Sequence, residues 1–252
     1  MRQRWTETLK RWIRPAIFRT LSSRPAFQCP ICHYQGPFKD KRITKSPRRL
    51  RLHSKCPGCA SAERHRLTYL ALQELFKGWS PTGKSVLHIA PEECLRDSLS
   101  TRFQPYHTSD LFKKDVDFQE DLQSLGFPDA SYDAVVVSRV LTVPPDLSAC
   151  LDEIRRILKP GGVAVIAEAY TLQKTAEFGE WRSGRSRIIG LDLIDEISAR
   201  FRELEQFFSR DFAREYQLDN LIEEEGSPVD DYPGLVCIPG GGFQNLVVVA
   251  YV

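Results

Sequence analysis

The sequence predicts an α/β fold, in which helices cover a largely parallel sheet and a small metal-binding module precedes the sheet. Short apolar runs alternate with helical segments from residue 84 onward, which is typical of parallel sheets. Two cysteine pairs, Cys29/Cys32 and Cys56/Cys59, precede this alternation. No run of eighteen consecutive apolar residues is present, so we expect no membrane-spanning helix.

The first predicted element is a basic amphipathic helix within residues 1–26. Apolar residues recur there at helical spacing with arginines between them, and Pro15 should break or kink the helix. We expect the tryptophans of this helix, Trp5 and Trp12, to pack on the protein itself. Peripheral contact with a membrane surface is the alternative.

The next element is a zinc-ribbon module over residues 27–61, followed by a linking helix and turn over 62–83. Each C-x-x-C pair turns tightly enough to place both of its sulfurs on one ion, and two pairs complete a tetrahedral zinc site. The four predicted ligands are Cys29, Cys32, Cys56 and Cys59. Because they close the coordination sphere, this Zn²⁺ should be structural. A thioredoxin-like redox pair is the competing interpretation, but that chemistry needs only one pair.

The seven cysteines are an odd number and include two tight pairs, which favours metal binding in a reducing compartment over a disulfide framework. We therefore expect a cytoplasmic protein. The sequence does not indicate its oligomeric state.

Charge divides the chain into a basic head and an acidic body. Residues 1–66 hold 17 Lys and Arg against 3 Asp and Glu, whereas residues 67–252 hold 18 against 30. Eight of the cations lie in residues 39–55, between the cysteine pairs. Such a segment attracts phosphates, including those of RNA. The alternatives are a solvated hairpin or a head that docks on its own acidic body.

The remaining elements follow from apolar periodicity and turn residues. Residues 62–76, 92–102, 147–158 and 191–201 are expected to be helices. Strands are expected at 86–90, 106–109, 116–118 (weak), 132–137, 163–167, 204–208 and 246–252. The segment 209–242 gives no clear pattern.

Three acidic positions recur just after predicted strands. Glu92 or Glu93 follows the first strand of the sheet, Asp110 follows the second and Asp121 follows the third. Ligands of open α/β sheets bind beyond the carboxyl ends of the strands. A carboxylate after the second strand can accept hydrogen bonds from ribose hydroxyls, and one after the third can accept them from an adenine amino group. These positions predict a nucleoside pocket.

Residues 121–166 resemble the central part of class I S-adenosylmethionine-dependent methyltransferases of the broad type-11 group. The resemblance rests on Asp121-Leu122, on the segment 127–133 (FPDASYD) and on the turn 158–162 (LKPGG). The cysteine pairs together with residues 63–66 (ERHR) also resemble bacterial zinc-ribbon methyltransferases of unassigned substrate.

This resemblance implies a methyltransferase domain over residues 84–252 with a Rossmann-like, seven-stranded sheet, helices on both faces and a reversed last strand. It also implies S-adenosylmethionine as cofactor. The residues expected to bind it are His88, Ala90, Pro91, Glu92, Asp110, Asp121, Leu122 and Ser138.

The chain departs from the family pattern in two loops. Ala90-Pro91-Glu92 replaces the usual glycine-rich turn, with His88 in place of an acid, and Glu92 is then expected to meet the ammonium group of the cofactor. Residues 140–144 (VLTVP) lack the acidic residue and histidine of many relatives. The catalytic residues are therefore unknown, with Glu168, Tyr170 and Arg139 as candidates at strand ends.

Three functions follow as hypotheses. The first is methyl transfer to an O or N acceptor on a small molecule or glycan. The second is methylation of RNA held by the basic N-terminal quarter. The third is a non-catalytic binding protein with a degenerate cofactor loop.

Overall fold

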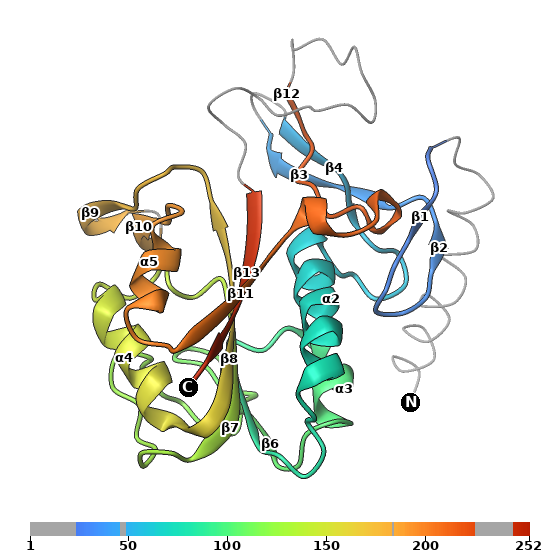
Figure 1. Ribbon diagram of the computed structural model, residues 1–252. Helices are drawn as coiled ribbons and strands as arrows, with labels where there is room; N and C mark the ends of the chain where they lie inside the picture. Colours follow the sequence, from blue (N-terminus) through green and yellow to red (C-terminus); the bar gives the residue numbers. More distant parts are fainter. Residues whose placement is uncertain (1–23, 46–48, 183, 225–243) are drawn as a thin grey trace.

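The computed structural model describes residues 24–45, 49–182, 184–224 and 244–252 (Figure 1). The predicted helix of residues 1–26 lies almost wholly outside them. The central feature is a six-stranded sheet with the order β11-β13-β8-β7-β5-β6. Its strands are β5 (Val86–Ile89), β6 (Tyr106–Ser109), β7 (Tyr132–Ser138), β8 (Leu158–Tyr170), β11 (Glu203–Phe208) and β13 (Gln244–Tyr251).

Strand direction confirms the mostly parallel sheet and the reversed last strand. β5 pairs in parallel with both β6 and β7, and β7 pairs in parallel with β8. β13 runs antiparallel to β8 and to β11. The carboxyl ends of β5 to β8 therefore lie at one edge of the sheet, as expected for a ligand site of an α/β fold.

The predicted seventh strand at residues 116–118 does not form. Only one isolated bridge, from Ser109 to Phe118, remains of it. One residue earlier, the side chain of Asp117 takes the place of a backbone partner, because its Oδ2 accepts hydrogen bonds from N and Oγ1 of Thr108 at 2.8 Å each. The expectation of seven strands was therefore wrong, and β6 is an edge strand.

Side chains alternate along each strand, so half of them point to one face of the sheet and half to the other. Val135 and Val137 point to a core shared with α4 (Leu147–Ile157) and α5 (Leu193–Ser198). Ala134 and Val136 point to a second core shared with α2 (Glu63–Gly78) and α3 (Glu93–Ser100). Figure 1 shows these two helix pairs on opposite sides of the sheet. Burial of both faces explains the nearly continuous apolar sequence of β7.

The cysteine module contains two short sheets. One pairs β1 (Phe27–Gln28) with β2 (Gln35–Gly36). The other has the order β12-β4-β3, made of β3 (Lys39–Thr44), β4 (Arg49–Lys55) and β12 (Ile222–Glu224). Strand β12 comes from late in the chain, so the module is completed by a segment far outside the predicted range 27–61.

Most predicted elements form within a few residues of their expected bounds. The sequence did not predict the hairpin β9 (Ala176–Arg182) and β10 (Arg185–Ile188), the single-turn helices η1 (Ser209–Asp211) and η2 (Arg214–Tyr216), or β12. β8 is also longer than expected, because it begins at Leu158, directly after α4 ends. Within the described part of the chain, no helix combines the length and apolar character needed to cross a membrane.

Candidate functional site

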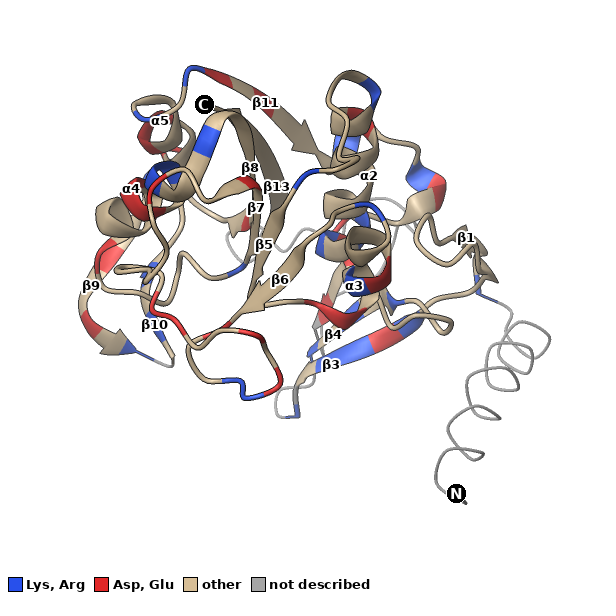
Figure 2. Cartoon of the chain, turned by 90° about the horizontal axis from the view of Figure 1, so that it is seen from below, with Lys and Arg blue, Asp and Glu red and all other residues tan. Residues whose placement is uncertain are grey.

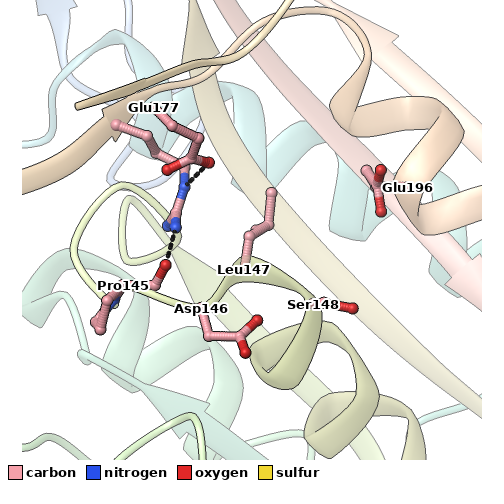
Figure 3. Close-up of a pocket in the computed structure, with 7 residues that line it drawn as sticks. Pro145, Asp146, Leu147, Ser148, Glu177 and Glu196 are labelled. Carbon is pink, nitrogen blue, oxygen red and sulfur yellow. Dashed lines mark hydrogen bonds and ion pairs between the residues drawn. The ribbon is translucent and has the colours of Figure 1, made fainter. Parts of the chain in front are cut away.

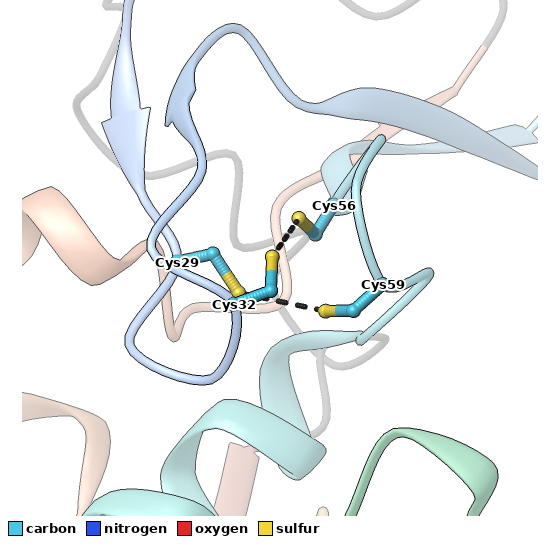
Figure 4. Close-up of side chains that lie close together, drawn as sticks. All are labelled: Cys29, Cys32, Cys56 and Cys59. Carbon is cyan, nitrogen blue, oxygen red and sulfur yellow. Dashed lines mark hydrogen bonds between the residues drawn. The ribbon is translucent and has the colours of Figure 1, made fainter. Parts of the chain in front are cut away.

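The four predicted metal ligands come together in the cysteine module. Their sulfur atoms all lie within 4.8 Å of one another, and the Cys29–Cys59 and Cys32–Cys56 pairs are both 3.6 Å apart (Figure 4). A disulfide requires about 2.05 Å, whereas Zn–S bonds of about 2.3 Å in a tetrahedron place sulfurs about 3.8 Å apart. The spacing therefore fits a tetrahedral metal ion and excludes disulfides between these pairs.

Local backbone turns set this geometry. His33 N donates to Cys29 O and Ala60 N donates to Cys56 O, both at 2.9 Å, which closes each C-x-x-C segment into a tight turn. A side chain at Gly58 would place its Cβ only 2.9 Å from Cys32 Sγ. Glycine is therefore required where the second turn passes the sulfur of the first.

A second group of side chains lies at the carboxyl edge of the sheet and centres on Glu92. Its Oε2 lies 3.2 Å from Nε2 of His88, and its Oε1 lies 3.8 Å from Nε2 of His65 in α2. Burial alone raises the pKa of Glu92, but the hydrogen bond and charge of His88, followed by His65 and Ser138, lower it below its usual range. Glu92 is therefore a stable carboxylate at the end of β5.

His88 itself is fully buried, with both ring nitrogens in contact with protein groups. Its Nδ1 lies 2.9 Å from the hydroxyl of Tyr106, and its Nε2 lies against Glu92. His88, one of the predicted cofactor residues, is therefore shielded from solvent and contacts the exposed part of the site through Glu92.

Two strand-end loops are joined by one lysine. Lys113 Nζ donates to the carbonyl of Pro91 at 3.2 Å and lies 3.8 Å from Oδ2 of Asp110. Oδ1 of Asp110 accepts the backbone N–H groups of Phe112 and Lys113 at 2.9 Å. Ala90 has a φ of 50°, where an L-residue is strained, and its N donates to Ser109 O at 2.7 Å.

Asp121 and Leu122 lie along the same edge, beyond the bridge at Phe118. Asp121 Oδ1 accepts the backbone N–H of Gln123 at 3.0 Å, and the Gln123 side chain accepts from Asp146 N at the start of α4. Leu122 is buried. The structure thus places the predicted adenine-binding residues next to α4, and the predicted ribose-binding residue after β6.

The strand ends of β7 and β8 hold Ser138, Arg139 and Glu168. Glu168 is buried, and its Oε1 accepts the N–H of Leu141 at 2.9 Å, while its Oε2 lies 3.8 Å from Arg139. Burial raises the pKa of Glu168. The third candidate, Tyr170, donates its hydroxyl to Gln244 Oε1 at 2.8 Å.

A pocket of about 430 Å³ opens between the loop after β7 and the β9–β10 hairpin (Figure 3). Arg187, which is 1% exposed, forms part of its wall. The guanidinium donates to the carbonyls of Leu141, Pro144 and Pro145 and pairs with Glu177. Arg187 therefore fixes the loop that follows β7. The pocket is lined by Pro145, Asp146, Leu147, Ser148, Glu177, Arg187 and Glu196.

Sequence reasoning missed three residues of these sites: His65, Lys113 and Arg187. Lys113 lies three residues after Asp110, a spacing that favours contact within a turn and offered a weak signal. The contacts of His65 with Glu92 and of Arg187 with the loop after β7 gave no such signal, because these partners lie far away in the sequence.

Comparison with known proteins gives a family match for part of the chain. Residues 75–166 match the family described as Methyltransferase domain. This match confirms the enzyme class predicted from the sequence, a methyltransferase.

Curated relatives match over short stretches of the chain. The chain is 32% identical over 90 residues to the hybrid PKS-NRPS synthetase mpsA of Macrophomina phaseolina and 40% identical over 67 residues to the fusarielin synthase FSL1 of Gibberella zeae. These matches cover 36% and 27% of this chain and 2% of each relative.

Solved structures resemble the chain more broadly but at low identity. Phosphoethanolamine N-methyltransferase 2 of Haemonchus contortus, in complex with S-adenosyl-L-methionine, is 20% identical with a TM-score of 0.49, covering 72% of this chain and 51% of the other. YcgJ of Bacillus subtilis is 15% identical with a TM-score of 0.48, covering 74% and 98%.

Proposed function

We propose that this chain transfers a methyl group from S-adenosylmethionine to an oxygen or nitrogen atom of a small molecule or glycan. One observation carries the proposal. Glu92 and Asp110 follow two adjacent parallel strands of the matched domain, and Lys113 links the two loops. Two carboxylates at the carboxyl ends of neighbouring strands suit a ligand that has both a cationic end and a ribose.

The residues present fit this cofactor. Asp110 would offer Oδ2 to a ribose hydroxyl, because Oδ1 is used by the backbone N–H groups of its own loop and Lys113 Nζ approaches Oδ2 only to 3.8 Å. The ionised Glu92 suits an ammonium group. Asp121 would accept from the adenine amino group beside Leu122. Ser109 Oγ, buried at the end of β6, has no hydrogen-bond partner in the described part of the chain and can serve the same ligand.

When bound, S-adenosylmethionine supplies an electrophilic methyl group on a sulfonium. The protein then needs mainly to orient an acceptor in line with that group. Arg187 and Glu168 hold the loop after β7 through backbone carbonyls and the Leu141 N–H, so this loop is a rigid wall for the acceptor. An acceptor that reacts in its neutral form needs no catalytic base.

We also propose that a structural Zn²⁺ occupies the four-cysteine site. The sulfur spacing and the tight turns support it. Because four thiolates close the coordination sphere, the ion would stabilise the module and take no part in methyl transfer.

Calorimetric titration of zinc-replete protein with S-adenosylmethionine and S-adenosylhomocysteine tests the proposal. Asp110→Ala and Asp121→Ala should each weaken binding about 10- to 100-fold, which corresponds to loss of one charge-assisted hydrogen bond. Asp129→Ala is the matched control, because Asp129 is 80% exposed and pairs with Arg156 away from the strand ends.

Absence of binding by the intact protein would contradict the proposal. It would indicate that the loop of Ala90, Pro91 and Glu92 has closed the pocket and that the chain is a binding protein. Equal affinity in all three variants would show that the cofactor binds elsewhere.

A further inference from the structure

His65 occupies the third position of α2, shortly after the second cysteine turn (residues 56–59). Its Nδ1 accepts the backbone N–H of Ala62, the residue that precedes the helix, at 3.1 Å. The turn also holds Ser61, the residue before Ala62, because Cys56 N donates to the carbonyl of Ser61 at 2.9 Å. One ring nitrogen of His65 is therefore an acceptor that is tied to the end of the cysteine module.

This contact determines where the ring of His65 carries its proton. Burial, followed by the charge of Arg64, lowers the pKa of His65 to about 3, although Glu92 opposes the shift, so the imidazole is uncharged at neutral pH. A neutral imidazole has one donor and one acceptor nitrogen, and because Nδ1 accepts from Ala62, Nε2 carries the proton. Cys94 Sγ lies 3.1 Å from the same Nδ1, and burial raises its pKa to about 12, so it is a neutral thiol there.

The donor nitrogen of His65 faces the carboxylate at the end of β5. Nε2 is buried and has no hydrogen-bond partner among the described residues. Oε1 of Glu92 lies 3.8 Å from it, and a movement of about 1 Å would bring the two atoms to hydrogen-bond distance. A buried N–H without an acceptor is unfavourable. Capping of the helix does not require it, because glutamate or glutamine serves as well at this position. The second ring nitrogen therefore indicates a role beyond the helix cap.

Glu92, which precedes α3, lies between two histidines from different elements. His88 in β5 contacts Oε2 at 3.2 Å, and His65 in α2 faces Oε1. Figure 2 shows α2 and α3 together on one side of the sheet. The side chain of Glu92 is only 12% exposed, so its orientation is set by these neighbours. A carboxylate with both oxygens oriented offers a fixed direction to a cation before that cation binds.

We infer that His65 is a positioning residue that orients the carboxylate of Glu92 toward the ammonium group of the cofactor, so that the helix leaving the cysteine module forms part of the cofactor site. This inference rests on the proposed methyl transfer. His65 acts through Glu92 and not on the reacting atoms. A neutral donor orients the carboxylate without adding a positive charge that would repel the ammonium group.

Two substitutions separate the orientation of Glu92 from the capping of the helix. His65→Asn places an amide oxygen near the position of Nδ1, so the Ala62 N–H keeps its acceptor while the donor to Glu92 is lost. His65→Gln places an amide nitrogen near the position of Nε2, so a donor to Glu92 remains. His33→Asn is the matched control, because His33 is exposed in the first cysteine turn and has a φ of 59°, which asparagine tolerates.

Calorimetric titration of these zinc-replete variants with S-adenosylhomocysteine and with methylthioadenosine tests the inference. The two probes share the nucleoside, but only S-adenosylhomocysteine has the amino-acid end with its ammonium group. His65→Asn should weaken binding of S-adenosylhomocysteine about tenfold and leave binding of methylthioadenosine unchanged. His65→Gln and His33→Asn should stay within about threefold of the intact protein for both probes. In cofactor-free protein, the imidazole nitrogen resonances of His65 should show the proton on Nε2.

The inference would be overturned if His65→Asn binds both probes as the intact protein does, or if it weakens both equally, which would indicate a general structural role. A larger loss of S-adenosylhomocysteine affinity in His65→Gln than in His65→Asn would indicate capping alone and would also overturn it. A proton on Nδ1 would have the same consequence, because Nε2 would then have none to donate.

The same titrations separate the inference from the proposed methyl transfer. If the intact protein binds neither probe, the proposed methyl transfer fails and the inference fails with it. If the intact protein binds S-adenosylhomocysteine and His65→Asn binds it equally well, only the inference fails.

Discussion

The cysteine module and the six-stranded sheet are stabilised in different ways. The buried apolar core of the module consists of Cys29, Phe38 and Cys56, and two of these three are predicted metal ligands. The sheet is covered on both faces by large apolar clusters. With so small a core, the module would be stabilised by the proposed metal ion and by buried polar contacts, whereas the sheet is stabilised by burial of apolar surface.

Arg66 shows how polar contacts serve the module. Its guanidinium is fully buried and lies 4.6 Å from the ring centre of Phe38. It donates to the carbonyls of Ser54 and Ser61 in the module and to those of Tyr216 and Gln217 in the late segment. One side chain thus ties α2, the second cysteine turn and the segment before β12 together.

The largest expected effect is that of metal removal. Chelation, or the variant Cys56→Ser, should unfold the module while the sheet persists, because structural zinc contributes about 10–16 kcal/mol in small domains. Hydrogen exchange should show loss of protection in β3, β4 and β12 but not in β7 or β8. Metal analysis should find about one zinc per chain in the control Cys94→Ser, whose thiol contacts His65. Equal loss of exchange protection in the module and in the sheet would show that the two regions are not stabilised in different ways.

The next effect concerns Arg66. Arg66→Met leaves four buried carbonyls without their donor and should destabilise the module by about 3–5 kcal/mol. Exchange protection in Tyr216 and β12 should fall together with that of β4. Arg64→Met, two residues earlier in α2, is the matched control and should change stability by less than about 1 kcal/mol. Similar losses in both variants would show that Arg66 does not act through these carbonyls.

A cavity in the sheet core should destabilise the sheet and leave the cysteine module unchanged. Ile154→Ala removes a fully buried side chain from α4 and should cost about 3 kcal/mol, measured by denaturant unfolding. Zinc content and exchange in β4 should stay unchanged. Ile154→Val should cost about 1 kcal/mol by the same mechanism. Release of zinc by Ile154→Ala would mean that the two regions unfold as one unit.

The smallest effect is expected at residues 116–118, where the predicted seventh strand does not form. Asp117→Asn weakens two hydrogen bonds to Thr108 and should lower the melting temperature by about 1–3 °C, because Asp117 is exposed. Burial raises the pKa of Asp117, but the Thr108 hydrogen bonds lower it below 3.8. Its contribution is therefore present above pH 3.8 and lost as the pH falls through the folded-state value.

The difference in melting temperature between the intact protein and Asp117→Asn should thus shrink below about pH 3.8. Asp115→Asn in the same loop is the control and should show no difference at any pH. A difference that grows in acid would contradict the assigned hydrogen bonds.

Sequence reasoning predicted the strands and helices of the sheet well because apolar periodicity reports local burial. It predicted the four cysteines that come together because the spacing within each pair is local too. The predicted strand at residues 116–118 does not form because Val116 is its only aliphatic residue, and the Asp117 side chain competes for the same backbone groups. β12 was not predicted because Ile222-Glu223-Glu224 has one apolar residue and its partner strand, β4, lies near the other end of the chain.

The motif at residues 63–66 illustrates the same limit. The sequence associated it with zinc-ribbon methyltransferases but did not predict the contacts of its members. The structure assigns three of them distinct contacts: Glu63 with Ser54, His65 with Cys94 and Glu92, and Arg66 with four carbonyls. None of these roles follows from spacing, because each partner is placed by the tertiary fold.

The pairing of β12 with β4 has a consequence for synthesis on the ribosome. The early hairpin leaves the exit tunnel long before its third strand exists, and strands β5 to β11 are translated in between. Until Ile222 emerges, Leu52 N lacks the Leu221 carbonyl to which it donates in the finished protein, and Arg66 lacks the carbonyls of Tyr216 and Gln217. The cysteine module is therefore begun before the sheet but completed after most of it, and a nascent chain arrested before residue 222 should present an unfinished module to the translation machinery.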